Sequence, residues 1–135
     1  MKDDEFIKKV IDIDPLDLDS HFRRLPAELA YYNSQYAEAY ARQLDAKRNL
    51  DQVHASTYKL VADSEKKMTV AAINAAIESD PIYAEARKEL VEAESEKQRL
   101  RGKVDVVLAK KEMLISLGAH MRSEMQTQNY GIREE

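Results

Sequence analysis

The sequence is poor in residues that interrupt helices and in residues that build covalent or phosphate-binding frameworks. It has no cysteine and no tryptophan, and only three glycines and three prolines among 135 residues. The lack of cysteine excludes a disulfide framework and a thiolate zinc site. The glycines are too scattered for a phosphate-binding loop or a dinucleotide fingerprint. Few glycines and prolines argue against sandwiches, barrels and alternating strand–helix folds, and favour long helices.

Long apolar runs are also missing. The longest uninterrupted apolar stretch falls far below the roughly 20 residues that span a bilayer. The start of the chain, "MKDDEFIKK", is acidic where a secretory signal would be basic. We therefore expect a cytoplasmic protein that has no contact with a membrane.

Charge is abundant but uneven. Charged residues make up 34% of the chain, and the net charge is −4. Residues 1–20 hold seven acids and three lysines, whereas residues 95–125 hold seven bases and four acids. A local basic surface is therefore compatible with an acidic mean charge.

Helical periodicity predicts two long helices joined by a short one. From Pro26, apolar residues recur at alternating spacings of three and four between Leu29 and Leu60, as in a coiled coil. Thr69 is a candidate N-cap for a short helix over 70–79, and Asp80 followed by Pro81 is a strong start signal for a helix over 81–126. The predicted fold is an all-α antiparallel hairpin of two long helices with a short elbow helix, assembling into an oligomer.

The same pattern divides the chain into three parts. We expect residues 1–25 to form an acidic N-terminal arm with short helical pieces, which either docks on a partner or frays. Residues 26–126 would be the helical hairpin and oligomerisation domain, and residues 127–135 a flexible tail. The pair Gly118–Ala119 favours either a close backbone approach or the beginning of fraying.

The distal half of the last helix is too apolar for a single partner helix. One helix covers only a narrow stripe, so this wider face needs at least two partners. The N-terminal pieces are one source, and other copies of the chain are the second. The predicted oligomer interface consists of Val106, Leu108, Met113, Ile115 and Leu117.

Basic residues border the same seam and form the candidate DNA-binding site. These residues are Arg101, Lys103, Lys110 and Lys111. Repeated around an oligomer, they would form a positive belt for the phosphates of single-stranded DNA. The alternative interpretation is that they are ordinary solvated edges of a coiled coil. Lys110 would be the cleaner mutational probe, because Lys111 falls on a nominal seam position.

Tyrosines cluster at the start of the first long helix and have two interpretations. Tyr31, Tyr32, Tyr36 and Tyr40 could stack on single-stranded bases. Core packing is favoured for Tyr32 and Tyr36, which occupy the seam. Catalytic motifs are lacking, and the three histidines lie in separate elements, so we expect neither an enzyme nor a metal or other cofactor.

The run "SDPIYAEARKELVEAESEKQRLRGKVDVVLAKKEMLISLGAHMRSEM" resembles the C-terminal helix of small phage recombination mediator proteins of the UvsY type. The shared features are the acidic cap, the charged middle, and Lys111, Leu114, Ile115 and Arg122 near the end. The resemblance is best over residues 80–125. It implies a ring-forming protein, in the cytoplasm of a bacterial host, that binds single-stranded DNA and loads a recombinase onto strands covered by single-strand-binding protein.

A second hypothesis needs no nucleic acid. The chain would then be a coiled-coil adaptor, scaffold or inhibitor that touches only protein. A homo-oligomer is compatible with both hypotheses. Salt-sensitive binding of an oligonucleotide distinguishes them.

Overall fold

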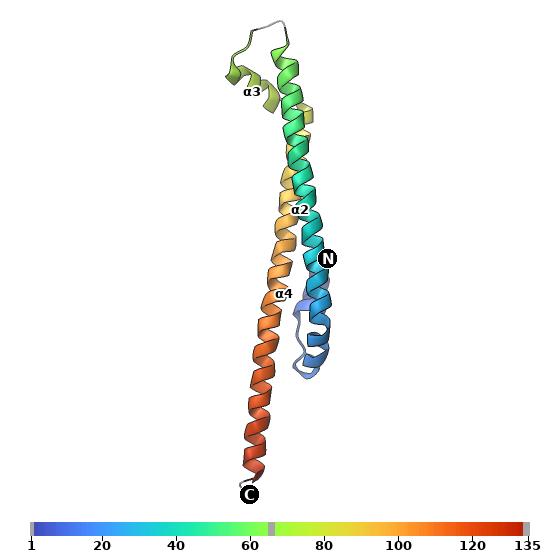
Figure 1. Cartoon of the computed structure of the whole chain (residues 1–135), viewed down its shortest axis with the longest axis vertical. Helices are drawn as coiled ribbons and strands as arrows, with labels where there is room; N and C mark the ends of the chain where they lie inside the picture. The colour runs from blue at the N-terminus through green and yellow to red at the C-terminus, as the bar shows by residue number, and fades with distance from the viewer. Residues whose placement is uncertain (1, 65–66, 134–135) are drawn as a thin grey trace. The chain divides into compact units, whose positions relative to one another are not determined.

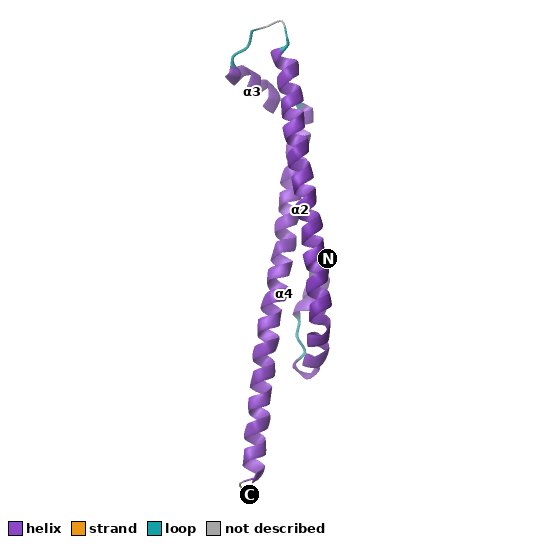
Figure 2. Ribbon diagram, viewed as in Figure 1, coloured by secondary structure: helices purple, strands orange, loops and turns teal. Residues whose placement is uncertain are grey.

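The structure is a computed structural model that describes residues 2–64 and 67–133, with side chains for residues 3–64 and 67–129. Every regular element in these residues is a helix (Figure 2). In chain order they are α1 (Lys2–Phe6), the π-helix η1 (Ile7–Ile11), the 3-10 helix η2 (Pro15–Asp17), α2 (Leu18–Ala62), α3 (Val70–Glu78) and α4 (Pro81–Arg133). The predicted all-α hairpin is confirmed, because α2 and α4 run antiparallel and pack against each other (Figure 1).

The chain divides into two compact units, each containing part of α2 and part of α4. Unit 1 comprises Met1–Ser34 and Arg101–Glu135, and unit 2 comprises Gln35–Leu100. The division passes through both long helices, instead of following the expected boundary after residue 25. All candidate DNA-binding and interface residues belong to unit 1.

The first long helix begins earlier than predicted. α2 starts at Leu18, directly after η2, and Pro26 lies inside it. Asp14 begins the helical stretch, because its side-chain oxygen accepts a hydrogen bond from the Leu16 N–H at 3.0 Å, and Pro15 occupies the first position of η2. The predicted start at Pro26 is therefore wrong. Packing of the first turns of α2 in the core of unit 1 offsets the hydrogen bond that a proline removes from a helix interior.

The other predicted starts are confirmed. The Thr69 hydroxyl accepts a hydrogen bond from the Ala72 N–H at 3.2 Å and caps α3. The Asp80 carboxylate accepts one from the Ile82 N–H at 2.8 Å and caps α4. α4 then continues to Arg133, so the helix extends past the predicted end at 126 and through most of the expected tail. Glu134 and Glu135, which belong to that expected tail, lie outside the described residues.

Unit 1 has a core with three contributing segments. Residues 2–14, here called the folded-back segment, turn back along α2 (Figure 1). Phe6 and Val10 of this segment pack with side chains of α2 and α4. The buried cluster consists of Phe6, Val10, Leu25, Val107 and Leu114. The N-terminal residues thus pack with the seam residues Val107 and Leu114 of α4, whereas Val106, Leu108, Met113 and Ile115, which widen its apolar face, stay exposed.

Unit 2 has a core in which two alanines accompany larger aliphatic side chains. Its buried residues are Ala39, Thr57, Ile73, Ile77, Ala86 and Leu100. Ala39 and Ala86 suit a narrow seam between two helices, and α3 adds Ile73 and Ile77. Unit 1 thus carries the larger aliphatic and aromatic core, and it is where the sequence placed the candidate functional residues.

Candidate interaction surface

Lys110 does not lie at a solvated edge. Its side chain is only 1% exposed, and its ammonium nitrogen lies 3.2 and 3.1 Å from the two carboxylate oxygens of Glu28 on α2. The Glu28 side chain is 13% exposed. The lysine therefore joins α4 to α2 through a buried, charge-assisted contact. Lys110 is also a poor probe of DNA binding, because changing it disturbs the core.

Lys103 is also engaged within the chain. Its ammonium lies 3.3 Å from a carboxylate oxygen of Asp3 and 5.0 Å from the centroid of the Phe6 ring. The lysine side chain is 13% exposed, whereas that of Asp3 is 67% exposed. Both contacts reach the folded-back segment, so Lys103 holds this segment on α4.

The two remaining bases are exposed. Arg101 and Lys111 both face solvent on α4. They are ten residues apart, which is about 15 Å along an α-helix. The structure therefore does not gather the four predicted bases into one belt on a single chain. Two of them hold the fold together, and two are free to meet a ligand.

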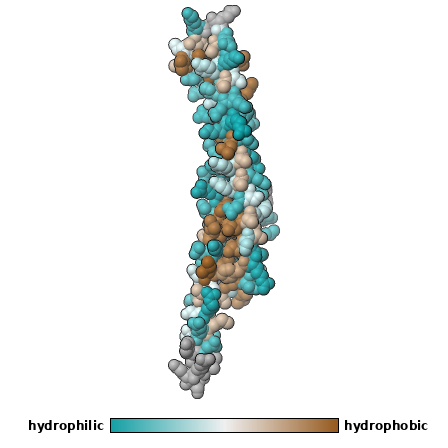
Figure 3. Space-filling view, in the orientation of Figure 1, coloured by the Kyte–Doolittle hydropathy of each residue, from teal (hydrophilic) through white to brown (hydrophobic). Residues whose placement is uncertain are grey.

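Four of the five predicted interface residues are exposed apolar side chains. Val106, Leu108, Met113 and Ile115 are 37%, 41%, 57% and 46% exposed, whereas Leu117 is half-buried. Figure 3 shows apolar surface concentrated over the middle of the molecule, where α4 and the N-terminal elements lie in Figure 1. The folded-back segment and α2 thus leave part of the apolar face of α4 uncovered.

The exposed apolar residues form two rows. The first row is Val106 and Met113, and the second row is Leu108 and Ile115. Residues seven apart share a side of an α-helix. Each row lies next in sequence to buried Val107 and Leu114, so each is turned about 100° from the buried stripe, in opposite directions. The uncovered surface therefore consists of two strips on either side of the seam, rather than one broad patch.

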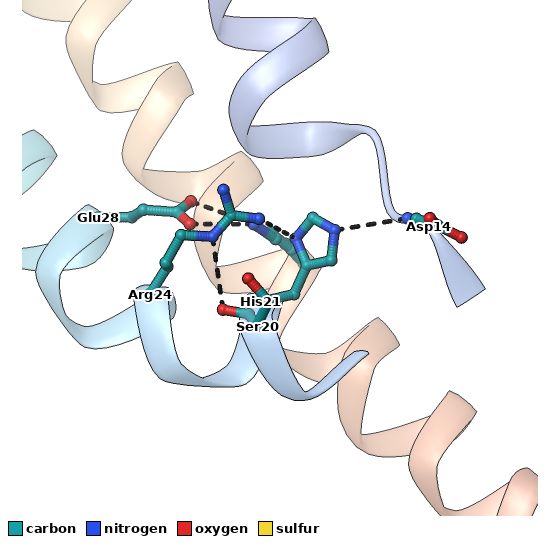
Figure 4. Close-up of polar contacts among 6 residues, drawn as sticks. Asp14, Ser20, His21, Arg24 and Glu28 are labelled. Carbon is teal, nitrogen blue, oxygen red and sulfur yellow. Dashed lines mark hydrogen bonds and ion pairs between the residues drawn. The ribbon is translucent and has the colours of Figure 1, made fainter. Parts of the chain in front are cut away.

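His21 connects the folded-back segment to α2. Its side chain is buried, and its Nε2 lies 3.4 Å from the Asp14 backbone N–H, which points at it (Figure 4). Its Nδ1 lies 3.3 Å from a guanidinium nitrogen of Arg24, whose Nε donates to the Ser20 carbonyl. A neutral imidazole has only one acceptor nitrogen, so the ring can accept from one of these two donors at a time. A protonated ring could accept from neither.

The tyrosines do not form a free stacking platform. Tyr32 is half-buried and meets the Phe6 ring edge-on at 5.0 Å between centroids. Burial raises the pKa of Tyr32 above the ordinary 10.0, and the neighbouring Tyr31 and Glu28 raise it further. Tyr31 is exposed in unit 1, whereas Tyr40 is exposed in unit 2 with the Lys97 ammonium 5.3 Å from its ring centroid. The interpretation of Tyr32 as a packing residue agrees with this geometry.

The described residues also show no arrangement typical of a metal site or of a membrane span. Within residues 2–64 and 67–133, no group of three or more histidine, aspartate or glutamate side chains is placed to hold a metal ion. Across the same described residues, no helix combines the length and the apolar character that crossing a bilayer requires.

Comparison with known proteins gives no relative. No family model matches the chain, and no curated protein or solved structure matches it either. The assignment of a function therefore depends on the surfaces described above.

Sequence reasoning missed four residues that organise this region. They are Asp3, Phe6, His21 and Glu28. Phe6 and Val10 are four residues apart and so share a face of a helix, which is the local signal for their burial. The partners of Lys103 and Lys110 had no local signal, because they depend on how segments distant in sequence align.

Proposed function

We propose that this protein is a self-associating helical adaptor that binds protein through the two exposed apolar rows of α4. One observation supports this proposal most directly: α4 is already paired with α2 and the folded-back segment, yet four of its apolar side chains stay exposed. They are Val106, Met113, Leu108 and Ile115. Apolar area removed from water contributes roughly 25 cal/mol per Å². Aliphatic rows repeated at heptad spacing are what a further helix would bury.

The charges give less support to the single-stranded-DNA hypothesis. Lys110 and Lys103 are matched to Glu28 and Asp3, and the chain carries a net charge of −4. Only Arg101 and Lys111 of the predicted set could contact phosphates without loss of an internal contact. Each phosphate neutralised on a single strand contributes about −0.7 to the slope of log affinity against log salt. Two residues per chain would therefore give useful affinity only in a large assembly.

The first test is the particle mass of variants with one row changed. Leu108→Asp with Ile115→Asp should reduce the mass measured by light scattering while helicity is kept. The matched control is Ala109→Asp with Ser116→Asp, two exposed residues that are also seven apart. A wild-type chain that stays a monomer at micromolar concentration would refute the self-association.

The second test measures binding of a labelled single-stranded oligonucleotide at low salt. The adaptor hypothesis predicts no binding by the wild-type particle. Binding that weakens with salt, and that Arg101→Ala with Lys111→Ala reduces, would instead favour the recombination-mediator hypothesis. Lys111 is the appropriate probe here because its side chain is exposed, unlike that of Lys110.

A further inference from the structure

The folded-back segment is attached to unit 1 by a small set of contacts. Phe6 and Val10 are buried in the shared core, and Asp3 meets the ammonium of Lys103. At the other end, the Asp14 backbone N–H points at the His21 ring at 3.4 Å. The contacts of Asp3, Phe6 and Val10 are made with side chains of α2 and α4, so they do not depend on which chain supplies α1 and η1. The Asp14 contact stays within one chain, because Asp14 also caps η2.

The turn that reverses the chain is short. Asp12 and Asp14 are both extended, with φ and ψ of −68° and 111° at Asp12 and −80° and 115° at Asp14. Pro15 follows, and a proline restricts the residue before it to extended conformations. A change of direction at the few residues between η1 and η2 would therefore move α1 and η1 as one piece, without unwinding α2.

The surface beneath the segment matches it in charge and in apolar character. It offers the apolar side chains of Leu25, Val107 and Leu114 beside the ammonium of Lys103. The segment presents Phe6 and Val10 together with an acidic first turn of Asp3, Asp4 and Glu5. The ring of Phe6 also packs under the Lys103 ammonium, at 5.0 Å. A second copy of the chain carries the same segment and the same surface.

We propose that α1 and η1 (residues 2–11) of the folded-back segment are exchanged between two copies of this chain, so that they pack on Lys103, Val107 and Leu114 of the other copy. Exchange of an identical element makes a dimer from contacts that the monomer already has. The proposal is separate from the adaptor function, because it uses the covered stripe of α4 and not its two exposed rows. It also gives the acidic N-terminal residues a partner of opposite charge in a second chain.

Cross-linking between introduced cysteines tests the exchange, because the chain has no cysteine of its own that could react with the reagent. Asp3→Cys and Lys103→Cys are made as two single variants and as one double variant. The double variant, treated with a short bismaleimide, gives the product formed within one chain. The two single variants are mixed, unfolded in urea, refolded together at high concentration and treated in the same way.

If the segment is exchanged, the mixture of the Asp3→Cys and Lys103→Cys chains should give a cross-linked product between chains. This product should be several-fold more abundant than in the matched control mixture of Asp4→Cys and Lys103→Cys chains. Adding Phe6→Asp to the Asp3→Cys chain should abolish the product, because docking needs this ring. The product should persist when both chains also carry Leu108→Asp and Ile115→Asp. Persistence of the product in these variants would show that the exchange does not depend on association through the exposed row of Leu108 and Ile115.

Two outcomes would overturn the proposal. One is efficient cross-linking within the double variant while the mixed single variants give no more product than the Asp4→Cys control. The other is a product between chains that survives Phe6→Asp, since it would arise from collision and not from docking. Neither outcome bears on the adaptor function, which the particle mass of the row variants tests separately.

Discussion

Removing Glu28 should destabilise the protein far more than removing an exposed carboxylate. The Lys110 side chain is 1% exposed, and Glu28 supplies both of its carboxylate contacts, at 3.1 and 3.2 Å. Glu28→Leu would leave a buried ammonium without its counter-charge. Breaking a buried pair in this way costs about 3–5 kcal/mol of the free energy of unfolding.

The reverse change should cost less. Lys110→Met leaves the Glu28 carboxylate, which is 13% exposed and therefore nearer to water than the ammonium was. The penalty for an unsatisfied polar group of this kind is about 1–3 kcal/mol, and more for a charge that stays fully buried. Replacing both partners, as Glu28→Leu with Lys110→Met, should bring the stability back to within about 1–2 kcal/mol of the wild type, because well-packed apolar residues often substitute for a buried pair.

Urea unfolding followed by far-ultraviolet circular dichroism measures all three variants. The control is Asp19→Asn, because Asp19 and Arg23 form an exposed pair with side chains 76% and 79% in solvent. This control should cost no more than about 1 kcal/mol. The reasoning fails if Glu28→Leu costs no more than Asp19→Asn, or if the double variant is as unstable as the two single changes added together.

Three further predictions concern α2, the glycines of α4 and Tyr32. Pro26→Ala should raise the urea midpoint, because a proline inside a helix costs about 3 kcal/mol relative to alanine and Pro26 lies inside α2. Gly102→Ala and Gly118→Ala should each stabilise by up to about 1 kcal/mol. A Cβ at Gly102 meets no atom within 4 Å, and one at Gly118 meets the Phe22 ring at an ordinary 3.8 Å. A loss of stability in Gly118→Ala would mean that close approach does matter there. Stability should fall as the pH rises from about 10 through the raised pKa of Tyr32, since the folded state then holds a proton that the unfolded state has lost. Tyr32→Phe should flatten this alkaline loss in pH-dependent urea titrations, and an unchanged slope would contradict it.

Local signals predicted the elements well where the capping residues were recognised. Asp80 with Pro81 and Thr69 gave the starts of α4 and α3, and both act as caps. Asp14 with Pro15 is the same pair of residue types, and it begins the helical stretch that leads into α2. The signal for the true start was therefore present in the sequence.

Register across the hairpin could not be predicted in the same way. Heptad spacing places Lys110 beside the seam, but it does not say which acid of α2 lies opposite. That choice depends on how the folded-back segment fills the core beside Leu25 and Leu114, and hence on packing between segments distant in sequence. The burial of Lys110 follows from this three-way contact, and no pattern within α4 indicates it.

The wide apolar face of α4 has two parts, of which one is covered within the chain and the other is exposed. The stripe of Val107 and Leu114 packs with Phe6 and Val10 of the folded-back segment. The rows on either side have no such cover, whereas Leu117 is half-buried. Because seven-residue spacing sets both rows, a partner that buries one of them must run nearly parallel to the axis of α4. A second α4 meets this requirement, which is consistent with the self-association proposed above.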